Sequence, residues 1–263
     1  MRPDSRFAAV LICFFLSGLA ALLYQTAWIR EFSFVFGTSA IAIAAVLAAY
    51  MSGLAVGAAA AGRFLTRVRR PVLVYGVLEA AIAASALAVP LLLRGATAAC
   101  HELLGGHPEL PAEGGTAVLA FFFVSSFLIL MVPTAFMGAT LPLLIRAAVH
   151  TDAQVGPRTG VLYGINTAGA VCGTVLAAFT LLPAIGLRAT VHVGVGVNFV
   201  VFLIAAVIAR KPARNQPPKD IDAVASVPFH PTPAARVMLA LVCLSGVTSF
   251  TYEVLWTRLL SHV

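Results

Sequence analysis

Seven apolar runs dominate this sequence, and each is long enough to cross a lipid bilayer as a helix. A helix needs roughly 20 apolar residues to cross a hydrocarbon core of about 30 Å. The runs cover residues 7–29, 38–62, 72–93, 117–145, 159–185, 189–209 and 237–256. Lipid admits only helices and closed barrels, and these runs lack the polar alternation of a barrel strand. We therefore expect an all-α integral membrane protein whose main partner is the lipid bilayer.

Composition and charge agree with this class. The chain is 60% hydrophobic and only 10% charged, whereas about a quarter of the residues in a soluble domain are charged. With a cytoplasmic amino terminus, thirteen of the 17 basic residues fall on the inside and four on the outside. Basic loops mark the cytoplasmic side. We expect an inner (plasma) membrane protein of the bacterial type with a cytoplasmic amino terminus, and no nucleic-acid partner, because topology already explains the basic balance.

A repeat links the beginning of the chain with its end. Residues 16–33 (LSGLAALLYQTAWIREFS) return as 244–261 (LSGVTSFTYEVLWTRLLS), with seven identities in eighteen positions and a spacing of 228 residues. Trp28 and Trp256 occupy the same repeat position. We interpret Trp28, together with Arg30, as an anchor at the membrane interface, since aromatic rings and long cations favour the head-group zone. The repeat predicts six spans followed by the first helix of a second membrane unit.

The segment between the sixth and seventh runs divides the chain. It is rich in Pro and in charged and amide residues, which bury too little apolar surface to fold, so we expect a cytosolic linker at 210–235. The linker separates a six-helix bundle at 1–209 from a repeat helix at 236–263. We expect this second unit to be truncated here, with the remaining C-terminal part of the same protein as its partner.

Two features predict a major-facilitator-like bundle. An even number of spans gives both repeat units the same orientation, as in transporters built from parallel repeats. The basic loop at 62–70 also resembles that of the major facilitator superfamily, although Thr66 stands where that family usually has Asp.

Glycine pairs four residues apart predict where helices pack closely. They are Gly53 and Gly57, Gly160 and Gly164, and Gly169 and Gly173. In lipid this small-xxx-small spacing lets two backbones approach. We favour close packing over a substrate path at all three pairs.

Four polar side chains within the runs make up the candidate intramembrane polar site: Glu79, Asn166, Gln25 and Glu253. Glu79 lies roughly 10 Å into its run at 1.5 Å per residue, so it must find a partner or hold a proton. A proton or amine site and a structural bond to a neighbouring helix are both open. Asn166 suggests an interhelical hydrogen bond, and Gln25 and Glu253 occupy equivalent positions of the repeat.

Three strings resemble the membrane region of multispanning spermidine-synthase-like proteins. They are the repeat at 16–30, GATLPLL at 138–144, and GVLYGINTAGA at 160–170, which is followed by Leu182-Pro183 and Gly186. The resemblance covers essentially the whole chain. It implies a facilitator-like membrane region fused to an aminopropyltransferase-like domain that would bind decarboxylated S-adenosylmethionine and an amine.

That catalytic domain has no counterpart within these 263 residues. No strand leads into a Gly-rich loop, so we assign no catalytic, cofactor-binding or metal-binding residue and expect no cofactor in this chain. His101, Glu102, His107, Glu109 and Glu113 share one outer loop, but their Gly-rich and Pro-containing surroundings favour a solvated loop over a metal site.

Two functions stay open, beside a third reading in which the chain is a scaffold that binds no ligand. We prefer the membrane module of a spermidine-synthase-like protein, with the catalytic domain outside this chain. Whether the full-length protein is an enzyme stays open. The alternative is half of a major-facilitator-like secondary transporter of a small polar or amine substrate.

Overall fold

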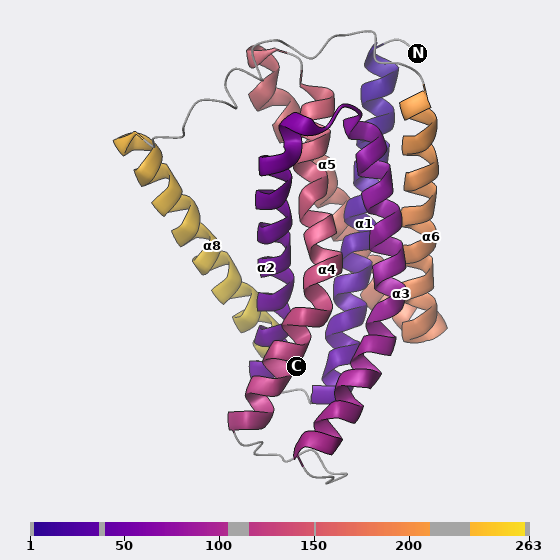
Figure 1. The fold of residues 1–263 in the computed structure, drawn as a ribbon, viewed down its shortest axis with the longest axis vertical. Helices are drawn as coiled ribbons and strands as arrows, with labels where there is room; N and C mark the ends of the chain where they lie inside the picture. The colour runs from indigo at the N-terminus through magenta and orange to yellow at the C-terminus, as the bar shows by residue number, and fades with distance from the viewer. Residues whose placement is uncertain (1–2, 37–39, 105–115, 150, 211–231, 261–263) are drawn as a thin grey trace.

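The protein is a bundle of long helices that run along a common direction (Figure 1). The computed structural model describes residues 3–36, 40–104, 116–149, 151–210 and 232–260. Its elements are α1 (Pro3–Phe36), α2 (Ala40–Phe64), η1 (Leu65–Arg67), α3 (Pro71–Leu104), α4 (Thr116–Ala148), α5 (Asp152–Leu176), η2 (Ala177–Leu181), α6 (Leu182–Arg210) and α8 (Pro233–Leu260). These described ranges contain no strand, and the all-α prediction is confirmed.

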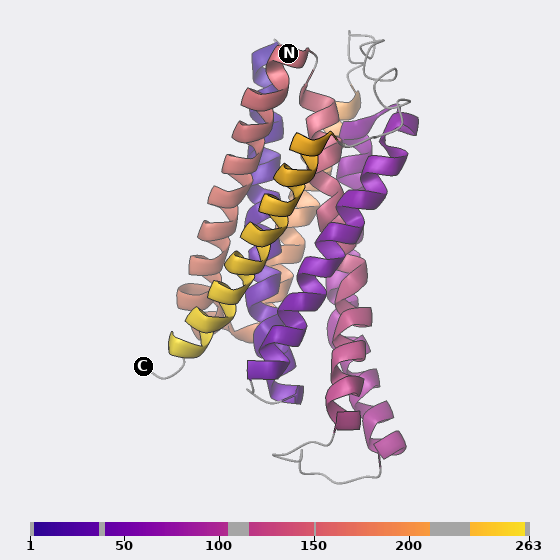
Figure 2. The ribbon, with the colours of Figure 1, turned by 90° about the vertical axis from the view of Figure 1, so that its left-hand side faces the viewer.

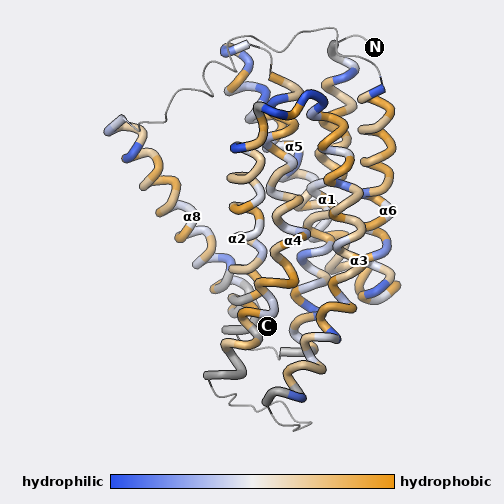
Figure 3. Tube along the Cα trace, viewed as in Figure 1, coloured by the Kyte–Doolittle hydropathy of each residue, from blue (hydrophilic) through white to orange (hydrophobic). Residues whose placement is uncertain are grey.

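Among the described residues, six helical stretches are long and apolar enough to cross a membrane. Wherever the structure describes them, all seven predicted runs are helical, but the fifth and sixth share one continuous stretch, Asp152–Arg210. Apolar residues make up most of each helix, and hydrophilic residues concentrate at the connection between α2 and α3 (Figure 3). These features fit an integral membrane protein. The major-facilitator-like arrangement and the boundaries predicted for the linker stay predictions, since residues 211–231 lie outside the described ranges.

Gly186 breaks this long stretch into two arms. Its backbone has φ 77° and ψ 177°, a conformation that glycine adopts without the steric cost a Cβ would bring. The break allows α5 and α6 to pack separately on α1, and α6 also contacts α3. One glycine thus determines that α1 is covered on two sides.

The helix ends that carry most basic residues lie together, at the end where the chain begins (Figure 1). The Arg6 guanidinium on α1 donates to the Ile208 carbonyl oxygen at the end of α6, at 3.4 Å. The Arg158 guanidinium on α5 stands 5.0 Å from the centre of the Phe7 ring. Most basic residues therefore gather at one end of the bundle, as predicted. Which end faces the cytoplasm stays a prediction.

Two of the three predicted glycine pairs pack as expected. A Cβ added to Gly57 would collide with the Ala135 backbone of α4, and one added to Gly173 would collide with the Leu19 backbone of α1. The prediction was wrong for Gly160 and Gly164, because no neighbouring atom lies within 4 Å of a Cβ built there. Their face of α5 points away from every helix that the structure describes.

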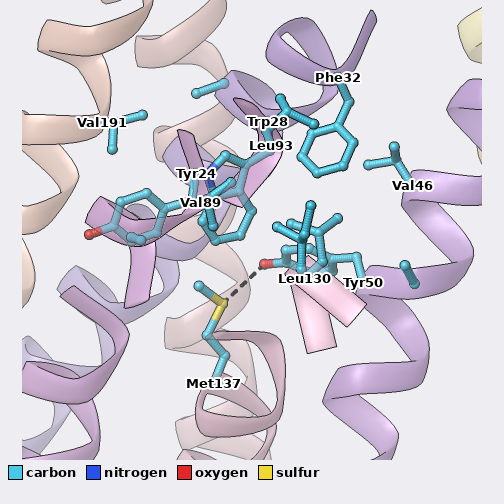
Figure 4. Packing of buried hydrophobic residues seen from close by; sticks show 14 of the residues in the cluster. Tyr24, Trp28, Phe32, Val46, Tyr50, Val89, Leu93, Leu130, Met137 and Val191 are labelled. Carbon is cyan, nitrogen blue, oxygen red and sulfur yellow. Dashed lines mark hydrogen bonds between the residues drawn. The ribbon is translucent and has the colours of Figure 1, made fainter. Parts of the chain in front are cut away.

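Trp28 belongs to the core, so the interpretation of this residue as an interfacial anchor was wrong. Its side chain is fully buried, and its ring stacks on Tyr24 with 5.3 Å between centroids and 13° between planes. Figure 4 shows both rings packed among Phe32, Tyr50 and their neighbours. Trp256, at the same repeat position, is 59% exposed. The aromatic ring packs wherever neighbouring helices cover it, and the sequence did not show that only one copy is covered.

The repeat helix α8 lies outside the bundle and runs in the same direction as α1 (Figures 1 and 2). It contacts α2, and nearly all its described side chains are exposed. Only its C-terminal half approaches the bundle, where Glu253 reaches α1. This contact closes one side of the candidate site.

Candidate intramembrane site

A cavity of about 330 Å³ lies between α1, α2, α4, α5 and α8. Three of the four predicted site residues, Gln25, Asn166 and Glu253, line it together. Small-molecule pockets in proteins measure roughly 300–1,000 Å³, so the space suits a small solute. The sequence identified these three residues, but the structure alone shows that they line the same cavity.

Gln25 and Glu253 form a contact along one side of the cavity. The Gln25 Nε2 atom donates a hydrogen bond to Glu253 Oε1 at 3.3 Å. The two residues are 228 positions apart, which equals the repeat spacing, so equivalent residues of the two repeat helices meet each other. The contact therefore joins α1 to α8 at one position of the repeat.

Hydroxyl groups give the cavity wall an excess of hydrogen-bond acceptors. The Oγ1 atoms of Thr140, Thr167 and Thr174 each donate to a carbonyl of their own helix, at 2.7, 2.9 and 3.1 Å. A hydroxyl that has given away its only proton can offer just its lone pairs to a ligand. With the Glu253 carboxyl added, the wall favours a ligand that donates hydrogen bonds and carries positive charge.

The aromatic side of the cavity is held by Tyr50. Its hydroxyl lies 3.2 Å from the Ala21 carbonyl oxygen, which accepts the proton, and 3.4 Å from the sulfur of Met137 (Figure 4). These contacts join α2 to α1 and α4. They position the ring at the cavity without occupying the acceptors on the opposite wall.

Asn166 occupies its place because α1 has a glycine opposite it. A Cβ added to Gly18 would lie 2.8 Å from Asn166 Oδ1 and would also meet the Asn166 backbone. Any residue larger than glycine at position 18 would push α5 away from α1 and widen the cavity. The hydrogen bond predicted for Asn166 stays a prediction, whereas its contact with α1 is present.

Glu79 is separated from the other three predicted residues. It is fully buried, it does not line the cavity, and both carboxyl oxygens lack a hydrogen-bond partner among the described residues. The Ser17 and Tyr75 hydroxyls interact with this carboxyl, but neither reaches it with full hydrogen-bond geometry. The predicted polar site is therefore two neighbouring sites, with Ser17 belonging to both.

Sequence reasoning missed Ser17 and Asn198. Ser17 lines the cavity and faces Glu79, while Asn198 on α6 donates from Nδ2 to the Glu79 carbonyl oxygen at 3.4 Å. Asn198 had a usable signal, since an amide inside an apolar run is costly unless it is paired. The only signal at Ser17 was that the second repeat copy also has a serine at this position. That signal does not distinguish a packing role from a functional one.

Within the described ranges, no group of three His, Cys, Asp or Glu side chains could hold a metal ion. The loop residues His107, Glu109 and Glu113 lie outside those ranges. The expectation of a solvated loop there stays a prediction.

Comparison with protein families, with curated proteins and with solved structures found no match to this chain. In the part of the chain that the structure describes, fold and site define a class: an all-helical protein with six membrane-length apolar stretches and a cavity among its helices that is lined by both polar and apolar side chains.

Proposed function

We propose that this chain is the membrane module of a spermidine-synthase-like protein and that the module binds a small amine cation in the cavity between its two repeat helices. The observation that carries the proposal is the set of hydrogen-bond acceptors that line the cavity. It combines one carboxyl group, held against Gln25 at 3.3 Å, with three hydroxyls whose protons are already donated. An ammonium group satisfies acceptors of this kind and balances the charge of Glu253.

The strings that carry the sequence resemblance support the same location. The string 138–144 contributes Thr140 to the cavity, and the string 160–170 contributes Asn166, Thr167 and Ala170. Residues conspicuous in sequence therefore gather around one space. The resemblance also implies an amine substrate for the attached catalytic domain. The module would supply this amine to the catalytic domain or remove its product.

Titration calorimetry of the purified protein in detergent tests the proposal. Putrescine should bind saturably, whereas 1,4-butanediol, which has hydroxyls in place of the ammonium groups, should not. Glu253→Gln should weaken putrescine binding by about tenfold or more, since a hydrogen bond to a charged group contributes roughly 1.5–3 kcal/mol. Glu102→Gln is the matched control, because this exposed carboxylate near the end of α3 lies outside the cavity. Equal binding of diol and diamine would contradict the proposal.

A second function uses the same cavity. Secondary transporters bind substrates near the bilayer midplane where two repeats meet, and the Gln25–Glu253 contact supports a transporter half for this reason. Uptake of labelled putrescine into liposomes containing the full-length protein distinguishes the two functions. Binding without uptake favours the module of an enzyme, and saturable uptake lost in Glu253→Gln favours the transporter.

A further inference from the structure

Glu79 is a buried carboxyl group that no basic side chain of the described residues is seen to pair with. It exposes none of its surface, and among the described residues neither Oε1 nor Oε2 has a hydrogen-bond partner. An ionised carboxylate in such surroundings is far more costly than a neutral carboxyl group. The resting protein therefore holds a proton at this position, in the interior of a membrane-spanning bundle.

The neighbouring helices supply no charge that would remove this proton. The side chains that lie near enough to influence the Glu79 carboxyl are Cys13, Ser17 and Tyr24 on α1 and Tyr75 on α3. From α6 comes Asn198, whose amide is neutral, and the only charged residue of α4 is Arg146 in its last turn. The apolar runs of α1, α3 and α6, at residues 7–29, 72–93 and 189–209, contain no Lys or Arg.

Ser17 connects the buried carboxyl group with the cavity. Its side chain is 8% exposed and lines the cavity beside Gly18 and Gln25, while its hydroxyl interacts with the Glu79 carboxyl. Tyr75 cannot replace it, because the Tyr75 hydroxyl donates to the Cys13 carbonyl oxygen at 3.2 Å and Tyr75 does not line the cavity. Ser17 is thus a residue that both lines the cavity and interacts with the buried carboxyl group.

We propose that Glu79 and Ser17 form a proton-exchange site, in which entry of an amine cation into the cavity expels the Glu79 proton through the Ser17 hydroxyl. The Ser17 oxygen accepts the proton from the carboxyl group as its own proton passes to a water molecule in the cavity. Ser17 ends unchanged, Glu79 ends as a carboxylate, and water carries the proton away. Putrescine brings two positive charges as one proton leaves, and the carboxylates of Glu79 and Glu253 together balance them.

The inference rests on the proposed function, because it needs an amine that enters the cavity. Its own test is proton release, measured with a pH-sensitive dye when putrescine is added to the weakly buffered protein in detergent. The wild-type protein should release protons as it binds putrescine. Glu79→Gln should still bind putrescine and release none, and Ser17→Ala should release protons more slowly.

Ser126→Ala is the matched control for the hydroxyl. Ser126 on α4 is buried, its hydroxyl has no partner among the described residues, and it does not line the cavity. This variant should release protons like the wild type. An equal slowing in Ser126→Ala and Ser17→Ala would show that only packing is affected and would overturn the role of Ser17.

Infrared difference spectroscopy keeps the inference testable if a variant folds poorly. Putrescine should remove the carbonyl-stretch band of a protonated carboxyl group from the wild-type spectrum. Putrescine binding with this band unchanged, or proton release that persists in Glu79→Gln, would overturn the inference and leave the proposed function standing. Absence of putrescine binding in the wild type would contradict the proposed function, and the inference would fall with it.

Discussion

Gln25 and Glu253 meet side chain to side chain at 3.3 Å although 228 residues separate them. Because this separation equals the repeat spacing, the contact joins two copies of one position. The two copies differ in charge, since one offers an amide and the other a carboxyl group. The repeated helix thus presents an asymmetric pair, with the amide on α1 and the carboxyl group on α8.

Trp28 and Trp256 provide a comparison within one protein, because they are the same residue at the same repeat position in different surroundings. Trp28→Ala should reduce the free energy of unfolding by roughly 3–5 kcal/mol, as expected for truncating a buried aromatic residue. Trp256→Ala should change it by less than about 1 kcal/mol, since the side chain is exposed. Unfolding curves in detergent measure both, and equal effects would contradict the packing of α1 described here.

Gly57 and Gly160 test helix packing in the same way. Gly57→Ala should destabilise the protein by about 1–3 kcal/mol, because its Cβ would enter the Ala135 backbone. Gly160→Ala meets no neighbouring atom and should be neutral or slightly stabilising, since Ala is the better helix former by about 1 kcal/mol. Thermal unfolding of the two variants gives the comparison. A loss of stability in Gly160→Ala would mean that another element covers this face of α5.

Cys100 tests the predicted orientation. It is half-buried near the end of α3, opposite the helix ends that carry most of the basic residues. With the amino terminus in the cytoplasm, an impermeant maleimide added to intact cells should label a variant that keeps Cys100 as its only cysteine. A variant that keeps only the buried Cys13 is the control and should stay unlabelled. Failure to label Cys100, with protease cleavage of residues 210–235 from outside, would invert the topology.

The sequence predicts the helices well because the physical rule behind them is local. Twenty apolar residues in lipid must satisfy their own backbone groups, so each run becomes a helix wherever it lies. The break at Gly186 agrees with the apolar pattern, because the predicted runs end at residue 185 and resume at 189. Only the structure shows that the chain turns there at a single glycine with φ 77°.

The site is less accessible to sequence reasoning because it depends on which helices are neighbours. Gln25 and Glu253 could be selected as repeat equivalents, but their contact depends on the position of α8. Glu79 and Asn166 were selected by the same cost of burying polar groups, yet they lie in different places. Ser17 and Trp28 show the opposite difficulty, since their roles follow from neighbours on α3, α5 and α6 that no local pattern specifies.

The measurement that tests the central claim most directly is putrescine affinity after the carboxyl group is moved across the Gln25–Glu253 pair. Glu253→Gln removes the carboxyl group, and adding Gln25→Glu returns it on the opposite helix while keeping an amide–carboxyl contact. The account predicts that affinity falls about tenfold or more in the single variant and returns close to the wild-type value in the double variant. Affinity unchanged in the single variant, or not recovered in a folded double variant, would contradict the claim that an amine binds at this pair.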